Sequence, residues 1–316
     1  MLNRRFLRIK VFQALYAYFA NPGVDIAIVE KNMMQSLRKV FDLYLYRFAI
    51  LLDILHAAEL NIEQNKEKRL PTEEDLNPNL RFVENKVLTT LRDNIELKEM
   101  LEKKKINWQN HFDDIKKTWR KIKNSDMYIN YMEHPQNDFK ADKKFVISLY
   151  EKFIQDEPVF EHLLHEQSIY WYTDMEVVDM NISKTINAIE ENTSPIKEVL
   201  FPLLKDEEDD TKFIKELLKK TILFENEYSD IIAKKTNNWE LDRIAVIDII
   251  LMKMGMCELE HFSSIPVKVT LNEYIELAKN FSTYKSKNFI NGILDRVVQE
   301  WKRENRIRKL GRGLKE

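Results

Sequence analysis

The scarcity of glycine is the feature of this sequence that most limits its fold. Only 5 of the 316 residues are glycine, and none lies between Gly23 and Gly255. Tight β-hairpin turns and phosphate-binding loops depend on backbone conformations that glycine adopts most readily. The scarcity therefore argues against hairpins, Rossmann units and nucleotide-binding loops. Together with 44% hydrophobic residues, 32% charged residues and long stretches of 3.6-residue periodicity, it predicts an all-α protein.

Three consecutive helical patterns lie near the carboxyl-terminal end. The first covers about residues 239–259 and has apolar residues on all sides, which is typical of a central, largely buried helix. The second begins near Pro266, or one turn later, because Thr270 and Glu273 have capping-box spacing. The third begins near Ser286. Short connections between the three predict a compact bundle.

The remaining segments are also mostly helical in pattern. We expect an amphipathic helix at 3–21, one or two long helices at 25–68, a loop at 70–78, helices at 79–122, a break at 124–142, helices at 145–192, a linker at 194–210 and a helix at 211–235. The acidic run 206–210 falls in the predicted linker.

Two runs in the carboxyl-terminal helices resemble the signature of the NusB family of transcription antitermination factors. They are Ile265-Pro266-x-Lys268-Val269-x-x-Asn272-Glu273-x-x-Glu276-Leu277-Ala278-Lys279-x-Phe281 and Phe289-x-Asn291-Gly292-x-Leu294-Asp295. The resemblance covers about residues 3–21 and 211–300 and implies a helical bundle of two packed subdomains, interrupted by a large helical insertion. We therefore expect a first core helix at 1–24, an insertion at 25–205, the remainder of the core at 206–301 and a basic tail at 302–316.

The first helix has a face that combines cationic and aromatic side chains. Its members follow each other at four-residue steps, namely Arg4, Arg8, Phe12 and Tyr16, with Arg5 and Gln13 beside them. Such a face suits single-stranded RNA, because arginines bind phosphates, rings stack on bases and an amide reads base edges. The alternative is that the two rings belong to the core and the arginines are merely solvated.

The resemblance favours the RNA interpretation of this helix. The arginine-rich start and the Gln13-Ala14-Leu15-Tyr16 element are similar to family elements that contribute to an RNA surface. The loop from Tyr284 is similar to a family loop near RNA, although Lys285 replaces a commonly acidic residue and should add phosphate attraction. The predicted RNA-binding residues are Arg4, Arg5, Arg8, Gln13, Tyr16, Lys285, Ser286 and Lys287.

The resemblance also implies partners. Family members bind boxA-type single-stranded RNA with the ribosomal protein NusE and act, with other Nus factors, on elongating RNA polymerase, notably in ribosomal RNA operons. The alternative is a protein–protein scaffold for ribosome assembly, in which the insertion supplies the main contacts and RNA binding is secondary. A third possibility is an RNA-modifying enzyme with a NusB-like domain, but no strand–glycine loop–helix pattern for a nucleotide cofactor is present.

No catalytic or metal-binding pattern stands out. His162 and His165 have helical spacing but no third ligand, so we interpret them as helix surface. Cys257 lies in an apolar helix, where a buried, inert thiol is the usual state. Gly292 lies within a periodic helix, and we expect it to let another helix approach closely. We predict a binding protein without enzymatic activity, cofactor or metal.

The charge distribution and the single cysteine suggest a compartment. The formal net charge is −2, yet both ends are basic, and the tail from Lys302 is expected to be either an RNA-binding arm or a solubilising end. One cysteine excludes an intramolecular disulfide and suggests a reducing environment. No uncharged apolar run approaches the roughly 20 residues that span a bilayer. We therefore expect a cytoplasmic protein with no membrane partner.

Overall fold

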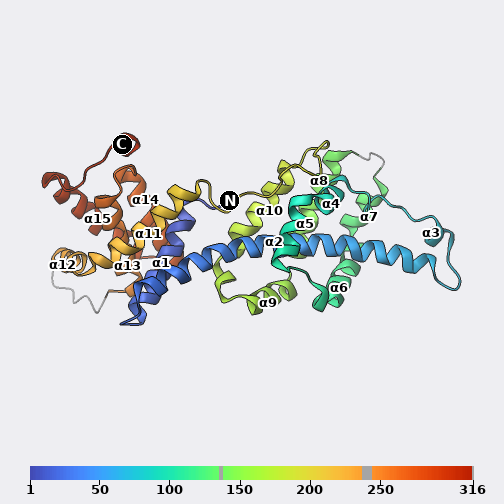
Figure 1. The fold of residues 1–316 in the computed structure, drawn as a ribbon, viewed down its shortest axis with the longest axis horizontal. Coiled ribbons are helices and arrows are strands. Elements are labelled where there is room, and N and C mark those ends of the chain that lie inside the picture. Colours follow the sequence, from blue (N-terminus) through green and yellow to red (C-terminus); the bar gives the residue numbers. More distant parts are fainter. Residues whose placement is uncertain (135–137, 237–243, 315–316) are drawn as a thin grey trace. The chain divides into compact units, whose positions relative to one another are not determined.

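The computed structural model describes residues 1–134, 138–236 and 244–314, and every regular element among them is a helix (Figure 1). The prediction of an all-α protein is confirmed. Two compact units are present. The terminal unit comprises residues 2–37 and 204–316, and the middle unit comprises residues 38–203 with Met1. One continuous helix, α2 (Ile26–Lys66), contributes its first residues to the terminal unit and the rest to the middle unit.

The terminal unit is built around one buried helix. Besides the start of α2, its helices are α1 (Arg4–Ala20), α11 (Glu207–Leu223), α12 (Glu225–Lys235), α13 (Val246–His261), α14 (Val267–Phe281) and α15 (Ser286–Arg303). The helix α13 packs against α1, α11, α12, α14 and α15. Every residue from Ile250 to Leu259 is buried. The prediction of a central helix that is apolar on all sides is confirmed.

Two predicted helix boundaries need correction. The first carboxyl-terminal helix begins at Val246, because Ala245 has an extended backbone; residues 239–243 of that prediction lie outside the described residues. The acidic run is helical instead of part of a linker. Asp206 caps α11 by accepting a hydrogen bond from the Asp209 amide at 3.0 Å, and the acids that follow form the first turn. Carboxylates are stabilised there by the positive end of the helix dipole.

The helix predicted at 211–235 is two helices. The break falls at Phe224, which lies between α11 and α12 and whose ring stacks on His261 with centroids 4.8 Å apart. The second carboxyl-terminal helix, α14, has Pro266 at its N-cap, so it begins before Thr270. The third, α15, begins at Ser286 as predicted.

The predicted close approach of another helix at Gly292 is wrong. A Cβ built on Gly292 has no described heavy atom within 4 Å, and the residue is exposed, so Gly292 serves no close approach among the described residues. The close approach occurs at Gly255 in the middle of α13. A Cβ there would lie 3.1 Å from Leu294 of α15 and 3.4 Å from Tyr274 of α14. Glycine lets both helices pack against α13 at this level.

The basic tail packs against the terminal unit over the part that the structure describes. Arg306 binds Glu260, with Nε 2.6 Å from Oε1, and the Leu310 amide donates to the Ser263 carbonyl at 3.0 Å. A Cβ on Gly313 would lie 1.9 Å from that carbonyl oxygen, so only glycine fits. Up to residue 314 the tail is therefore neither a free arm nor an unstructured end.

The middle unit surrounds α2 with shorter helices. They are α3 (Glu73–Leu76), α4 (Lys86–Asp93), α5 (Ile95–Lys104), α6 (Phe112–Lys123), α7 (Asp126–Glu133), α8 (Phe139–Tyr150), α9 (Pro158–Gln167) and α10 (Met175–Ala188). Indole nitrogens of Trp108 and Trp171 donate to α2 carbonyls at 3.1 and 2.7 Å. The predicted loop 70–78 contains α3, and the predicted break 124–142 contains α7; Pro135 in that break lies outside the described residues.

Buried polar side chains join these helices. The guanidinium of Arg47 is 1% exposed and donates to the Ile154 carbonyl at 2.8 Å, in a π-helical turn that follows α8. Such a turn leaves backbone carbonyls without their usual helical donors. Asp179 of α10 lies 3.2 Å from Arg47 Nε and neutralises the buried charge. The middle unit therefore has a core of its own.

Neither a membrane-spanning element nor a metal-binding cluster is found in the described part of the chain. No described helix is long and apolar enough to cross a bilayer. No group of three or more histidine, cysteine, aspartate or glutamate residues could hold a metal within the described ranges. His162 lies 3.3 Å from Glu166, and the ring of His165 stacks on Tyr172. Cys257 is buried, and burial raises the pKa of its thiol to about 12.

Candidate nucleic-acid interface

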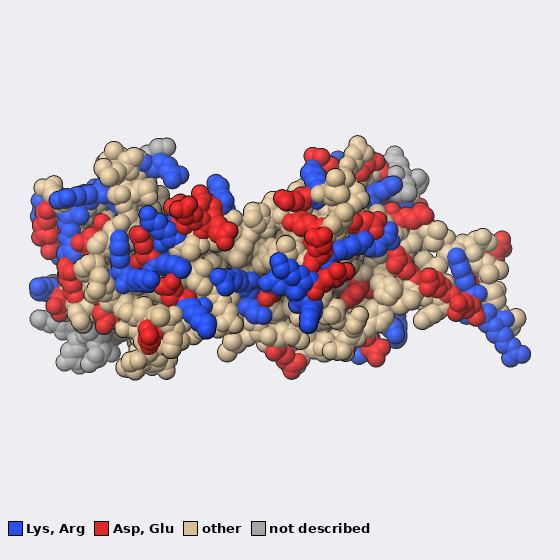
Figure 2. All heavy atoms as spheres, in the orientation of Figure 1, with Lys and Arg blue, Asp and Glu red and all other residues tan. Residues whose placement is uncertain are grey.

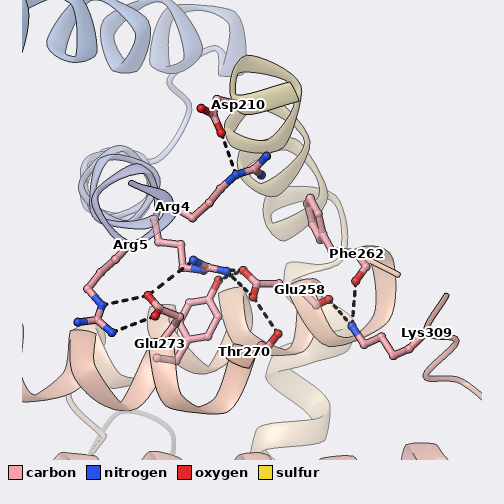
Figure 3. A network of polar contacts seen from close by, with 10 residues as sticks. Arg4, Arg5, Asp210, Glu258, Phe262, Thr270, Glu273 and Lys309 are labelled. Carbon is pink, nitrogen blue, oxygen red and sulfur yellow. Dashed lines mark hydrogen bonds and ion pairs between the residues drawn. The ribbon is translucent and has the colours of Figure 1, made fainter. Parts of the chain in front are cut away.

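The arginines at the start of α1 each meet carboxylates from distant parts of the chain. Arg4 Nη2 lies 2.6 Å from Asp209 Oδ2, and Arg4 Nε lies 2.8 Å from Asp210 Oδ1 (Figure 3). The same guanidinium lies over the ring of Phe213, 4.3 Å from its centroid. The side chain of Arg4 is 34% exposed, so its remaining N–H groups are accessible. The first turn of α11 thus fixes where Arg4 points.

Arg5 is the most exposed of the three predicted arginines. Its Nε and Nη2 donate to the two carboxylate oxygens of Glu273 at 3.0 and 2.9 Å. This side-chain hydrogen bonding is the main cause of a raised Arg5 pKa. The side chain remains 43% exposed. A guanidinium has five N–H donors, so three of them are not used by Glu273.

Arg8 lies inside the terminal unit. Its side chain is 2% exposed, and its Nε and Nη2 donate to Glu258 at 2.7 and 2.8 Å. Burial acts to lower the Arg8 pKa, but the neighbouring charge of Glu258 raises it overall. Glu258 also accepts hydrogen bonds from Thr270 Oγ1 at 2.8 Å and Tyr274 Oη at 3.2 Å (Figure 3). Arg8 therefore ties α1 to α13 and α14.

The face that continues along α1 lies next to α14. Arg5 contacts Glu273, and Phe12, two turns later, lies 5.2 Å from the ring of Phe281, two turns later in α14. The two helices therefore run in the same direction. Phe12 is buried, whereas Tyr16, one turn further, is 47% exposed. Gln13 is half-buried. The exposed ring of Tyr16 thus lies at the end of the helix pair from which the predicted loop leaves.

The loop after α14 exposes an aromatic ring and Lys285, and the half-buried Lys287 follows in the first turn of α15. Tyr284 is 82% exposed, and Lys287 Nζ lies 4.2 Å from its ring centroid. Lys285 is also exposed. Ser286 is 4% exposed, and its Oγ lies 2.9 Å from the hydroxyl of Ser282. Ser286 therefore shapes the loop from inside and does not face solvent.

The base of the loop is attached to the central helix. Ser282 donates to Oδ1 of the buried Asp248 of α13 at 2.5 Å. Thr283 lies 2.8 Å from the Ser286 hydroxyl. These contacts hold the loop while its tip remains accessible. Asp248 was not predicted as a site residue, and its place in an apolar helix was the only available sign that it has a polar partner.

A cleft of about 1010 Å³ lies beside the α1 arginines. Its charged lining includes both signs, from Arg4, Arg5, Arg8, Lys205, Asp206, Asp209, Asp210, Glu273 and Arg312. Figure 2 shows basic and acidic side chains interspersed over this unit on the face in view, without one uniform basic area. The sequence predicted the cations but not these partners, because the acids come from α11, α13 and α14.

Comparisons with known proteins identify the family. Residues 174–299 match the model of the NusB family. The transcription antitermination protein NusB of Salinibacter ruber is 36% identical over 137 residues, which are 42% of this chain and 86% of the relative. The chain belongs to the NusB family. The predicted resemblance is thereby confirmed.

Two further NusB proteins match shorter parts of the chain. The transcription antitermination protein NusB of Chloroherpeton thalassium is 48% identical over 83 residues, which are 26% of this chain and 39% of the relative. That of Myxococcus xanthus is 36% identical over 121 residues, which are 38% of this chain and 84% of the relative. No solved structure matches the chain. The family model covers residues 174–299 and therefore includes part of the segment predicted as the insertion. The expected core boundaries at 24 and 205 stay a prediction.

Proposed function

We propose that this NusB-family protein is a transcription antitermination factor. In this proposal it binds boxA-type single-stranded RNA together with the ribosomal protein NusE. The joined unit acts on the RNA polymerase elongation complex with other Nus factors, in ribosomal RNA operons. We expect it to act in the cytoplasm, without catalysis or a cofactor. Family membership and relatives named for antitermination support the general function.

The observation that carries the RNA part of the proposal is a pair of exposed rings, the second of which has lysines beside it. Tyr16 is 47% exposed and Tyr284 is 82% exposed. Base–aromatic stacking contributes about 1–3 kcal/mol per base and tolerates different sequences. Lys285 and Lys287 beside the second ring supply phosphate contacts. We propose this surface, together with Arg5 and the amide of Gln13, as the primary RNA contact.

The other predicted residues take indirect roles in the proposal. Arg4 keeps accessible N–H groups and reaches RNA at the edge of the surface. Arg8 and Ser286 are buried, so we propose that they position α1 and the loop. Removing either should affect RNA binding only through the fold of the terminal unit.

The test is a titration of labelled boxA-like RNA at several salt concentrations, with and without NusE. Tyr16→Ala should weaken binding about tenfold, which corresponds to the loss of one stacked base. Tyr172→Ala is the matched control, because Tyr172 is 77% exposed in the middle unit. Binding that tightens with NusE and weakens with salt would support the proposal. Equal binding by both variants would contradict it.

The scaffold alternative is favoured by one observation, the separate core of the middle unit. In that case a cell relying on Tyr16→Ala protein should assemble ribosomes normally although RNA binding is lost. If antitermination is the function, the same variant should reduce read-through of a terminator placed after a boxA-type element.

A further inference from the structure

We propose that the middle unit has a second RNA-binding site, which lies between α2 and α6 and takes a phosphate of single-stranded RNA. The site is a hollow of about 350 Å³. Among the described residues that line it are three cations of α6, Lys116, Arg120 and Lys123, and no acidic residue. The proposal shares with the proposed function only the premise that the protein binds RNA.

The three cations lie on one face of α6 at four- and three-residue spacing, so their charges add at the hollow. Arg120 is exposed, and its guanidinium has no hydrogen bond or ion pair to any described residue. Lys116 lies 3.6 Å from Asp113, a side chain that is 89% exposed and therefore largely screened by solvent. Lys123 donates to the amide oxygen of Asn61 at 3.2 Å and makes no ion pair with a described residue. The three positive charges therefore gather at the hollow with little neutralisation by carboxylates of the described residues.

The other cations of the same helix are different. Lys117 binds Asp114 at 2.9 Å, and Lys121 binds Glu157 at 2.8 Å. Neither lines the hollow. An unopposed fork of N–H donors matches the geometry of a phosphate group. Carboxylates thus already pair with Lys117 and Lys121, whereas the cations that line the hollow are left to bind an anion.

A neighbouring hollow favours RNA over an acidic peptide. It measures about 390 Å³ and shares Asn61, Trp119 and Lys123 with the first. Its remaining lining includes a ring and amides, groups of the kind that stack on bases and bond their edges, from Tyr128, Asn65, Asn77 and Asn79, whereas Phe82 is 1% exposed and belongs to the core. Glu74 and Asp75 also line it, so this second hollow suits a base and not a phosphate.

Trp119 connects the two hollows. Its ring is 6% exposed and stacks on Phe82 with centroids 4.9 Å apart. The indole Nε1–H has no acceptor among the described residues. A buried donor left unpaired is costly, and the oxygens of a bound nucleotide are acceptors of the kind that it lacks. We therefore place the phosphate beside Arg120 and the adjoining base on the far side of Lys123.

The experiment compares two charge-matched variants of the full chain, Arg120→Gln and Lys117→Gln. The probe is a labelled oligouridylate, which lacks a boxA-type sequence. Arg120→Gln should weaken binding at least about tenfold, as expected for one charge-assisted hydrogen bond. It should also lower the slope of log Kd against log salt by about 0.7 for each phosphate that is no longer neutralised. Lys117→Gln should change neither value, and both variants should unfold at the wild-type temperature.

Three results would overturn the proposal. One is an equal loss of affinity in both variants, which would mean that only the overall charge matters. The second is competition by uridine monophosphate or inorganic phosphate as strongly as by oligouridylate, which would assign the hollow to a free anion. If an acidic peptide displaces the oligouridylate but needs Arg120, the ligand is a protein and the RNA assignment falls.

The outcome is separable from that of the proposed function. Loss of boxA binding in Tyr16→Ala with no effect of Arg120→Gln would sink the second site alone. Dependence of oligouridylate binding on Arg120, with no preference for boxA-type RNA and no effect of Tyr16→Ala, would sink the proposed function alone. Fluorescence quenching of the tryptophans by RNA, reached at correspondingly higher RNA concentration in Arg120→Gln, would locate the bound strand independently.

Discussion

The helices α1 and α6 are both amphipathic and rich in cations, yet they differ in what surrounds those cations. On α1, Arg4, Arg5 and Arg8 each contact one or two carboxylates from α11, α13 or α14. On α6, Arg120 contacts no carboxylate of the described residues. The comparison teaches that an arginine-rich helix face does not by itself indicate an accessible positive surface. Acids supplied by distant segments decide whether the charge binds the fold or a ligand.

The largest effect is expected where a cation is fully enclosed. Glu258→Gln removes the nearer of two carboxylates beside Arg8, whose side chain is 2% exposed, and leaves only Glu273 at 3.6 Å from Arg8 Nη1. Breaking a buried ion pair by removing one partner costs about 3–5 kcal/mol. We expect the free energy of unfolding of the terminal unit to fall by about that amount in denaturant titrations. Glu157→Gln, which removes the partner of the exposed Lys121, should cost less than about 1 kcal/mol.

A double variant sharpens this prediction. With Arg8→Met added to Glu258→Gln, the unpaired charge is gone and part of the lost stability should return. If the double variant is as unstable as the sum of the two single variants, Arg8 and Glu258 do not act as a pair. The buried network of Figure 3 would then owe its stability to Thr270 and Tyr274 alone.

The second prediction concerns a variant in which an arginine of α1, like Arg120 of α6, lacks its carboxylate partner. Glu273→Gln releases Arg5, which is 43% exposed, from its carboxylate partner. Glu273 also lies 3.6 Å from Arg8 Nη1, so two ion pairs are lost and the free energy of unfolding should fall by at least about 1 kcal/mol. At the same time RNA affinity should rise about threefold at low salt, because a nearby negative charge is removed and the neutral amide of glutamine competes less strongly for the N–H donors of Arg5. A Glu276→Gln variant, one turn away on α14, controls for the change in net charge.

The sequence accounts for much of the fold and for less of the site. The glycine distribution and the apolar pattern of α13 predict an all-α bundle with a central helix, because local periodicity reflects burial directly. The family motifs in α14 and α15 identify the bundle. The boundary at Asp206 was missed because an acidic run is typical both of linkers and of first helical turns. Gly292 and Gly255 could not be distinguished, since close approach depends on the neighbouring helix.

The site was predicted incompletely for a related reason. The spacing of Arg4, Arg5 and Arg8 indicates a shared helix face, and it does not indicate which cations meet acids more than 200 residues away. Tyr16 is exposed and Phe12 is buried, although both belong to the same four-residue series. Contacts between remote segments therefore decide the roles of residues that local pattern treats alike.

The third prediction concerns a lysine enclosed by backbone and not by acids. Lys309 Nζ donates to the carbonyls of Phe262 at 2.9 Å and Glu258 at 3.3 Å (Figure 3). Burial lowers the pKa of Lys309 to about 8 from its ordinary value of 10.5. Between these values the unfolded chain binds more protons than the folded one, so this group makes stability rise with pH across that window. Below this pH window Lys309 is charged in both states, and burying the charge lowers the free energy of unfolding by its full amount.

The measurement is the difference in unfolding free energy between wild type and Lys309→Gln at several pH values. Other groups titrate in the same range, including Cys257, whose raised pKa makes stability fall above about pH 9. Their contributions are common to both proteins and cancel in the difference. The wild type should therefore gain stability relative to Lys309→Gln as the pH rises from 8 toward 10. A difference that does not change with pH would mean that Lys309 titrates normally.

The smallest effect is expected at the unopposed arginine itself. Arg120→Ala should change the free energy of unfolding by no more than about 0.5 kcal/mol, because the exposed guanidinium makes no described interaction on which the fold depends. Arg4→Ala, which breaks the ion pairs with Asp209 and Asp210 and uncovers the ring of Phe213, should cost about 1 kcal/mol. A larger destabilisation from Arg120 than from Arg4 would reverse the comparison and make Arg120 a structural residue. If Arg120→Ala leaves the free energy of unfolding almost unchanged but weakens the binding of oligouridylate, Arg120 contributes to binding and not to folding. This is the result expected for an arginine without a carboxylate partner among the described residues.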